Sequence, residues 1–419
     1  MSTIASIRAL QILDSRGNPT LRVFVATKNG HVGVASVPSG ASTGSHEAHE
    51  LRDGDKKKFG GKGVSVAVQR VADLGRELKG MRVANQRLLD ETMIAIDGTE
   101  NKSKLGANAM LGVSLACMKA AALEAKQPLY RYVRSAFHLQ YKDWRLPLPT
   151  MNVINGGVHA DSGLSVQEFM IIPRQKKFVD RVRAGSEVFM ALKKILHDNN
   201  HVTAVGDEGG FAPKVGGSEK ALQLLVEAIK KAKYTLLTDI ALGMDVAASE
   251  FYKKGVYNFE GKKKSSADMV RMLASWQKKY PIISIEDPLH EDDWAGWEMA
   301  TDVLSAGGKE KFTAIVGDDL FVTNRERLER GIDSGVANTI LIKLNQIGTV
   351  TETIDTIVAA QEAGYKVSVS HRSGETADTF IADLAVAVHA DYLKAGSLSR
   401  SERVEKYNRV MEIEEELRG

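Results

Sequence analysis

The sequence predicts an α/β protein in which a (β/α) barrel follows a smaller α+β domain. Six short apolar runs each end in a charged residue or a histidine, which is typical of buried parallel strands that lead to a functional rim. These ends recur every 23 to 41 residues, about the length of one strand–helix repeat. The first third of the chain instead carries strands and then helices, without regular alternation.

Residues 4–38 predict a small antiparallel meander, because three runs of β-formers are separated by the turn signals DSRGNP and NG. Helical stretches follow at 64–79, 84–96, 107–125 and 128–136. Residues 138–150 contain two prolines and show no clear period. We therefore expect an α+β domain over residues 1–137 and a barrel domain over residues 138–419, with strand–helix alternation from about residue 150.

Each apolar run of the barrel ends in a residue that can take part in chemistry. Because the carboxyl ends of parallel strands meet at one rim, we expect three carboxylates, two lysines and a histidine to lie together. One such acid could be a helix N-cap, but three in register are harder to explain as caps. In chain order the six residues are Asp245, Glu286, Asp318, Lys343, His371 and Lys394.

The three carboxylates predict a metal site. Packed together without counter-charge they would repel one another, and one or more would take up a proton. A divalent cation removes this repulsion, and oxygen ligands without cysteine or paired histidine favour Mg²⁺ over zinc.

Two further features of the rim predict an anionic substrate and a base. Lys343 ends the apolar run TILIK, and buried lysines are rare unless they are functional or paired. Burial and a nearby cation would lower the pKa of Lys343 and make it a usable general base. Beside His371, the residues Arg372 and Ser373 offer a guanidinium fork and a hydroxyl that suit a phosphate group.

Three loops add weaker signals. The segment 38–55, rich in Gly, Ser and Thr, is either a flexible connector or a mobile lid whose hydroxyls reach a cation or phosphate. The segment 152–171 carries His159, Gln167 and Glu168 among glycines, although a lone loop histidine is more often structural. The segment 205–213, VGDEGGFAP, is either a plain turn or a turn that holds Glu208 at the rim position of the preceding strand.

The composition is that of an ordinary globular protein, with 43% hydrophobic and 26% charged residues. A net charge of +3 over 419 residues gives no argument for nucleic-acid binding, and we expect the lysine runs at 56–58 and 262–264 to be solvated loops. The single cysteine, Cys117, is expected to be a packed thiol. Without a secretory signal or a long apolar run, we expect a cytoplasmic protein with no membrane span.

Taken together, the motifs resemble the enolase family. They span residues 13 to 403, nearly the whole chain, and their collective specificity is high. The matching stretches are LDSRGNPT, SGASTG with Glu47 after it, NVINGG, QEFMI, GDEGGFAP, IEDP, GDDLFVTN, KLNQIGT, SHRSGET and AGSLSRSER.

The resemblance implies an α+β domain capping a (β/α)8-type barrel with an irregular start. It implies a lyase of glycolysis and gluconeogenesis that reversibly dehydrates 2-phospho-D-glycerate to phosphoenolpyruvate. By motif, Lys343 would remove the C2 proton, and Glu208 would assist departure of the C3 hydroxyl with Glu168 and His159 beside it. The substrate contacts that it implies are His159, Gln167, Glu168, Lys343, His371, Arg372, Ser373 and Lys394.

The cofactor implied by the resemblance is Mg²⁺ at two sites. Asp245, Glu286 and Asp318 would hold the first ion. Ser42, in the Gly/Ser-rich loop, would join a second ion recruited with the substrate phosphate.

The resemblance also implies a homodimer or an octamer of dimers. Family members usually carry Glu where Arg22 stands and Arg where Glu412 stands, and these two positions pair across the dimer interface. Our hypothesis is a charge-swapped intersubunit pair, and the alternative is two unrelated surface changes.

Two other functions compete with this interpretation. An acid-sugar dehydratase or epimerase of the same superfamily would share the barrel and the carboxylates but usually lacks SGASTG and GDEGGFAP. A non-catalytic binding protein on the same fold could lose Lys343, Glu208 or a metal carboxylate. This chain retains both motifs and all of these residues.

Overall fold

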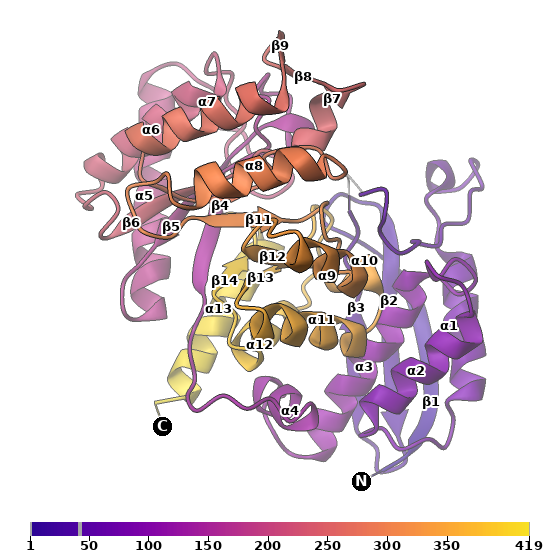
Figure 1. Cartoon of the computed structure of the whole chain (residues 1–419). Helices are drawn as coiled ribbons and strands as arrows, with labels where there is room; N and C mark the ends of the chain where they lie inside the picture. Colours follow the sequence, from indigo (N-terminus) through magenta and orange to yellow (C-terminus); the bar gives the residue numbers. More distant parts are fainter. Residues whose placement is uncertain (1, 41–43, 419) are drawn as a thin grey trace.

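The computed structural model describes residues 2–40 and 44–418, which form two parts that lie side by side (Figure 1). The N-terminal part has a three-stranded antiparallel sheet in the order β1-β2-β3, with helices packed on one face. Its elements are β1 (Ile4–Leu13), β2 (Pro19–Thr27), β3 (Val32–Ser36), α1 (Ser65–Glu77), α2 (Gln86–Asp97), α3 (Ala107–Glu124) and α4 (Leu129–Ala136).

Helix α3 is the buried centre of the N-terminal part. Its small side chains allow close approach to the sheet: a Cβ on Gly33 of β3 would lie only 2.0 Å from the carbonyl oxygen of Ala116. Cys117 is fully buried in this helix, and burial raises the pKa of its thiol. A buried thiol of this kind is unreactive, so the prediction of a packed cysteine is confirmed.

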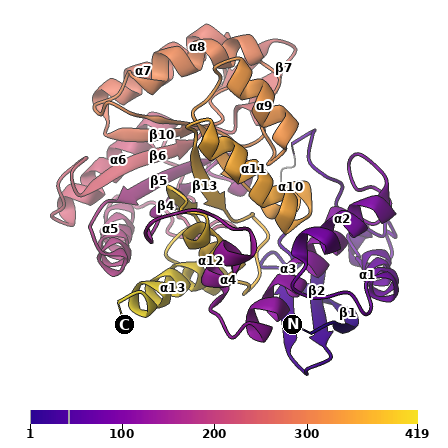
Figure 2. The ribbon, with the colours of Figure 1, turned by 60° about the horizontal axis from the view of Figure 1, so that its bottom comes forward.

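The larger part is a closed eight-stranded barrel in the order β10-β11-β12-β13-β14-β4-β5-β6, which confirms the predicted α/β class (Figure 2). All neighbouring strands pair in parallel except β5, which is antiparallel to both β4 and β6. The barrel strands are β4 (Leu148–Asn155), β5 (Glu168–Pro173), β6 (Ile240–Asp245), β10 (Ile282–Glu286), β11 (Ala314–Gly317), β12 (Thr339–Ile342), β13 (Lys366–Ser370) and β14 (Tyr392–Lys394).

Helices surround the barrel (Figures 1 and 2). The expected alternation from residue 150 is wrong at its start, because two strands and then two helices precede β6. Regular alternation begins only at β6. The helices are α5 (Phe178–Asp198), α6 (Ser218–Lys231), α7 (Ser266–Lys279), α8 (Trp294–Ser305), α9 (Arg325–Asp333), α10 (Leu344–Ile347), α11 (Val350–Glu362), α12 (Phe380–Ala387) and α13 (Ser401–Glu416).

Backbone contacts fasten the N-terminal part to the barrel rim. Ser39, after β3, exchanges two backbone hydrogen bonds of 2.8 Å with Gly374, in the loop that follows β13. Only glycine fits there, since a Cβ on Gly374 would lie 2.4 Å from Asp14 Oδ2. The nitrogen of Ser15 also donates to Glu375 O at 2.8 Å. These bonds bring the Gly/Ser-rich loop region to the rim.

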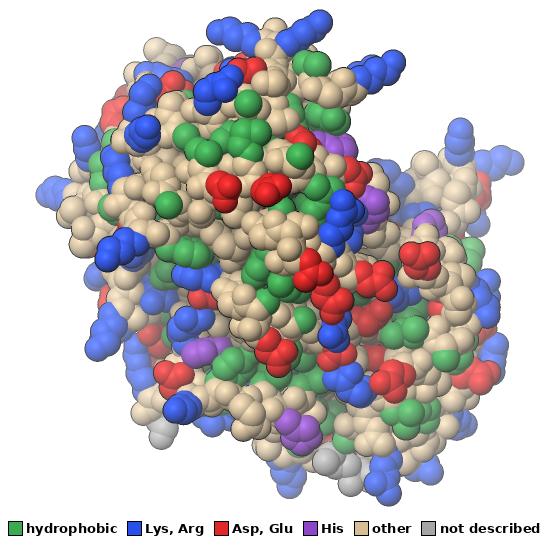
Figure 3. Space-filling view, viewed as in Figure 1, with side chains coloured by type: hydrophobic (Ala, Val, Ile, Leu, Met, Phe, Trp, Pro, Cys, Tyr) green, Lys and Arg blue, Asp and Glu red, His purple; other side chains and the backbone are tan. Residues whose placement is uncertain are grey.

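Exposed lysines cover a small sheet that projects from the barrel. The sheet consists of β7 (Tyr252–Lys253), β8 (Val256–Phe259) and β9 (Lys262–Lys264), and the lysines appear in blue at the top of Figure 3. The expectation of a loop at 262–264 is therefore wrong, because these residues pair with β8. Lys56–Lys58 lie in an exposed turn as predicted. None of the described helices is long and apolar enough to cross a membrane.

Candidate active site

The six predicted residues meet at one end of the barrel. Asp245, Glu286 and Lys394 are the last residues of β6, β10 and β14, and the other three directly follow β11, β12 and β13. A small cavity opens there. The predicted site residues that line this cavity, among the residues that the structure describes, are His159, Gln167, Glu168, Glu208, Asp245, Asp318, Lys343, His371, Arg372, Ser373 and Lys394. Glu286 is not among the residues that line the cavity, but it contacts Lys394, which is.

Lys394 is the centre of the acidic rim. Its Nζ lies 2.7 Å from Glu286 Oε1, 3.0 Å from Asp245 Oδ2 and 3.2 Å from Glu168 Oε1. Burial alone would lower the pKa of Lys394, but these carboxylates outweigh it and the pKa is raised well above its usual value. Burial and the neighbouring Asp245 still raise the pKa of Glu286. The negative charge of the rim thus exceeds what Lys394 can neutralise.

Asp318 is held by three neighbours. Lys343 Nζ lies 2.5 Å from Asp318 Oδ2, and Gln346 Nε2 donates to Oδ1 at 2.9 Å. The carboxylate of Asp287 accepts the backbone N–H groups of Asp318 and Asp319, each at 2.9 Å. This network fixes both the backbone and the carboxylate of Asp318 at the rim.

The pKa of Lys343 differs from the sequence expectation. Burial lowers it, but the adjacent Asp318 carboxylate outweighs burial, and the net pKa is raised. The expected lowering is therefore wrong for this arrangement, because the sequence could not show that Asp318 forms a direct ion pair with Lys343. A base role requires Asp318 to exchange that partner for another cation.

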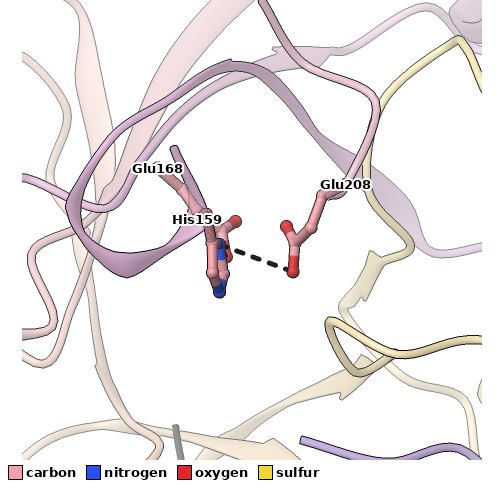
Figure 4. Close-up of side chains that lie close together, drawn as sticks. All are labelled: His159, Glu168 and Glu208. Atoms are coloured by element: carbon pink, nitrogen blue, oxygen red, sulfur yellow. Dashed lines mark ion pairs between the residues drawn. The ribbon is translucent and has the colours of Figure 1, made fainter. Parts of the chain in front are cut away.

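Glu168, Glu208 and His159 form a second buried cluster (Figure 4). Because β5 runs antiparallel, its first residue, Glu168, pairs in register with Asp245, the last residue of β6. His159 Nδ1 lies 3.7 Å from Glu168 Oε1 and 3.7 Å from Glu208 Oε1. Reversal of one strand thus places a strand start, rather than a strand end, at the rim.

Glu208 reaches the cluster from a turn and not from a strand end, so the expected strand before it is wrong. The turn lies between α5 and α6, where Val205 and Phe211 form an isolated bridge. Phe211 also pairs with Ile154 at the end of β4, with a 2.8 Å hydrogen bond from Asn155 N to Phe211 O. The turn therefore lies against the rim through β4.

The two carboxyl groups of this cluster differ in their tendency to hold a proton. Burial and the negative charge of Glu208 raise the pKa of Glu168 well above its usual value. Burial would also raise the pKa of Glu208, but His371 and His159 outweigh it and the pKa is lowered. Asn152 Nδ2 donates to Glu208 Oε2 at 3.0 Å as well. Of the two carboxyl groups, Glu168 therefore has the greater tendency to hold a proton.

Arg372 and Ser373 follow His371 at the rim, and both are buried. Arg372 Nη1 donates to Glu47 Oε2 at 2.8 Å and Nη2 donates to Oε1 at 3.2 Å, a two-pronged pair with the N-terminal part. Gln167 Nε2 lies 3.5 Å from Asp245 Oδ2. The two candidate phosphate contacts and the carboxylate cluster therefore line one cavity.

Comparison with known proteins agrees with this architecture. Family models described as the enolase N-terminal domain and the enolase C-terminal TIM barrel domain match residues 4–133 and 143–419. A curated protein named enolase, from Elusimicrobium minutum (strain Pei191), is 54% identical over 418 residues, which are 100% of this chain and 97% of that protein. The chain belongs to the enolase family.

Whether a metal ion fits this site depends on the ligand atoms that its side chains offer. Two described groups have ligand atoms that all lie within 4.8 Å of one another: His159 with Glu168 and Glu208, and Asp287 with Asp318 and Asp319. The carboxylates at the rim are buried oxygen donors, and burial and the neighbouring Asp245 raise the pKa of Glu286, an effect that a cation would oppose. The predicted set of Asp245, Glu286 and Asp318 is not one of these groups, although Asp318 belongs to the second. The oxygen donors at the rim are of the kind that a hard divalent cation prefers. Ser42 lies outside the described residues.

Four residues of the enolase-family site were missed by sequence reasoning. Asn152, Asp287 and Gln346 orient Glu208 and Asp318, and Glu47 pairs with Arg372. Each of the four lies in one of the motifs that carry the family resemblance, close in sequence to a predicted rim residue. Its polar side chain could have marked it as a candidate, but only the fold shows which rim residue it contacts.

Proposed function

We propose that this chain catalyses the Mg²⁺-dependent, reversible dehydration of 2-phospho-D-glycerate to phosphoenolpyruvate. The observation that carries the proposal is one cavity lined by Lys343, by the Glu168–Glu208 pair and by buried carboxylates. Removal of a proton next to a carboxylate needs a base, and loss of the neighbouring hydroxyl needs an acid. Both kinds of group line this cavity.

In this proposal Lys343 removes the C2 proton. Its ion pair with Asp318 keeps it protonated, so Asp318 must turn towards another cation before Lys343 can accept a proton. Removal of the proton puts a second negative charge on the substrate carboxylate. Lys394, whose raised pKa keeps it positive, would stabilise that charge.

Asp245, Glu286 and Asp318 are the residues that would hold the first Mg²⁺, and Ser42 would join the second. Bound there, magnesium would supply positive charge to the substrate carboxylate as that carboxylate gains its second negative charge. Gln346 and Asp287 support this role because they orient Asp318.

We propose that Glu208 delivers a proton to the departing C3 hydroxyl, which leaves as water. The pKa of Glu168 is raised and that of Glu208 is lowered, but an anionic substrate beside Glu208 would raise the pKa of Glu208 as well. His159 lies between the two carboxylates. Arg372 and Ser373 would bind the phosphate, while Gln167, His371 and Lys394 line the substrate.

The test is the ultraviolet absorbance of the enol product after addition of 2-phosphoglycerate, with and without Mg²⁺. We expect product only when Mg²⁺ is present. Lys56→Ala, in an exposed turn, is the control variant and should retain wild-type activity. A chain that makes no enol product in saturating Mg²⁺ would exclude the proposal.

We also propose that the protein acts in the cytoplasm and forms a homodimer or an octamer of dimers. The boundary between its two domains is proposed to lie between residues 137 and 138. The outer face of the N-terminal sheet supports an interface, because Leu10, Val32 and Val34 are exposed there. Arg22 lies on the same face, opposite Leu10 and Ser36 in register. An apolar sheet face of this kind is suited to a second copy.

A further inference from the structure

Arg403 is a buried arginine to which the proposed function gives no role. It lies in the first turn of α13, at the end of the motif AGSLSRSER, and is fully buried. Its guanidinium donates to the backbone oxygens of Arg372 at 2.6 Å, Ser373 at 2.7 Å and Asp207 at 3.2 Å. Arg403 therefore joins the loop after β13 to the turn that carries Glu208.

The same guanidinium determines which nitrogen of His371 carries a hydrogen. Arg403 Nη1 lies 2.6 Å from His371 Nδ1. Every guanidinium nitrogen is a donor and none can accept, so Nδ1 must be the acceptor. A neutral imidazole that accepts at Nδ1 carries its hydrogen at Nε2. Burial, which lowers the pKa of His371 to about 4, keeps the ring neutral.

The hydrogen on Nε2 lies near the Glu208 carboxylate. Nε2 lies 3.4 Å from Glu208 Oε1, which is long for a hydrogen bond, and it makes no shorter bond among the described residues. Both His371 and Glu208 line the cavity. The Nε2 hydrogen can therefore serve the Glu208 carboxylate or an oxygen of the substrate.

We propose that Arg403 is a positioning residue that fixes the Nε2–H tautomer of His371 and thereby makes His371 a hydrogen-bond donor at the reacting end of the cavity. The catalytic consequence rests on the proposed function. When Glu208 gives its proton to the departing hydroxyl, Oε1 gains negative charge beside the Nε2 hydrogen. A donor held in place before that step stabilises the charge without rearrangement.

The direct test is solid-state ¹⁵N NMR of the full chain labelled with [¹⁵N]histidine, with His371 assigned from the signals missing in His371→Gln. At neutral pH we expect an unprotonated Nδ1 and a protonated Nε2. The opposite tautomer, or a mixture, would overturn the proposal. The spectrum requires no turnover, so its failure is distinct from a failed activity assay.

Arg403→Met tests whether Arg403 is the cause. Lys406→Met is the matched control, because Lys406 lies on the same helix, is also fully buried and binds the same loop through Glu375 Oε2 (2.8 Å) and Thr376 O (2.7 Å). We expect Arg403→Met to lose the single Nε2–H tautomer and Lys406→Met to retain it. An unchanged tautomer in Arg403→Met, or an equal change in both variants, would contradict the assignment.

If Arg403→Met does not fold, the wild-type protein still decides the question. In a sample labelled with [¹⁵N]arginine and [¹⁵N]histidine, His371 Nδ1 should show a through-space ¹⁵N–¹⁵N contact to a guanidinium nitrogen, as the 2.6 Å separation requires. Absence of that contact would overturn the proposal.

Discussion

Buried lysines balance only part of the negative charge at the rim. Lys394 contacts three carboxylates and Lys343 contacts one. An unpaired buried carboxylate costs several kcal/mol. Burial, together with neighbouring carboxylates, raises the pKa values of Glu168 and Glu286. At the scale of single residues, the site is therefore suited to additional positive charge.

Lys394→Met should destabilise the protein by about 3–5 kcal/mol, because it leaves buried carboxylates without their shared partner. If those carboxylates bind Mg²⁺, added Mg²⁺ should restore part of the loss, since a ligand of the folded state stabilises it. Urea unfolding at pH 7 with and without Mg²⁺ measures both effects.

Lys406→Met is the control for this prediction. It breaks an equally buried ion pair, with Glu375, away from the proposed metal ligands. Mg²⁺ should not offset its cost. Equal Mg²⁺ responses in the two variants would contradict the assignment of the metal ligands.

At the scale of elements, the strand ends were predictable and the reversed strand was not. An apolar run that ends in a charged residue is a local pattern, so the sequence predicts that Asp245, Glu286 and Lys394 end barrel strands. The run EFMIIP carries no signal of direction, and Glu168 reaches the rim only because β5 pairs antiparallel to β6. Glu208 likewise depends on a long-range contact of its turn with β4.

The contact between α2 and α11 should make stability depend on pH. Asp90 of α2 is fully buried and accepts hydrogen bonds from Gln86 Nε2 (3.1 Å) and from Thr351 N (3.0 Å) and Oγ1 (2.7 Å). Burial raises the pKa of Asp90 from its usual 3.8 to about 6. Between these values the unfolded chain has lost the proton that the folded chain retains, so stability falls as pH rises.

Above pH 6, the loss of unfolding free energy attributable to Asp90 should be about 3 kcal/mol, since each pKa unit corresponds to about 1.36 kcal/mol. Asp90→Asn removes the titration, so the difference in unfolding free energy between wild type and variant should change by about this amount between pH 4 and pH 7. Urea unfolding at the two pH values measures it. A difference that stays constant with pH would show that Asp90 does not titrate in this window.

At the scale of the whole molecule, the N-terminal part has two functional faces. One edge supplies Glu47, which pairs with Arg372 at the rim, and the outer face of the sheet exposes apolar side chains beside Arg22. Within its own chain, Arg22 Nε donates to Ser36 Oγ at 2.9 Å, and the largely exposed Glu412 pairs with Arg409 at 3.1 Å. Both residues remain accessible to a second copy.

The charge-swap hypothesis predicts that Arg22→Glu weakens the dimer at least tenfold in Kd, about 1.4 kcal/mol, because two acids would then face each other. The double variant Arg22→Glu with Glu412→Arg should restore the affinity. Sedimentation equilibrium measures Kd for each variant. A double variant that dimerises no better than the single one would favour unrelated surface changes.

The central claim is that Lys343 removes a proton from C2 of 2-phosphoglycerate in a site built from the barrel rim. The most direct measurement is exchange of the C2 hydrogen with deuterated solvent, followed by NMR with Mg²⁺ present. We expect rapid exchange in the wild type and a loss of about 10² to 10⁴-fold in Lys343→Ala, with Mg²⁺ binding by calorimetry largely intact. Exchange at the wild-type rate in Lys343→Ala would show that another group removes the C2 proton.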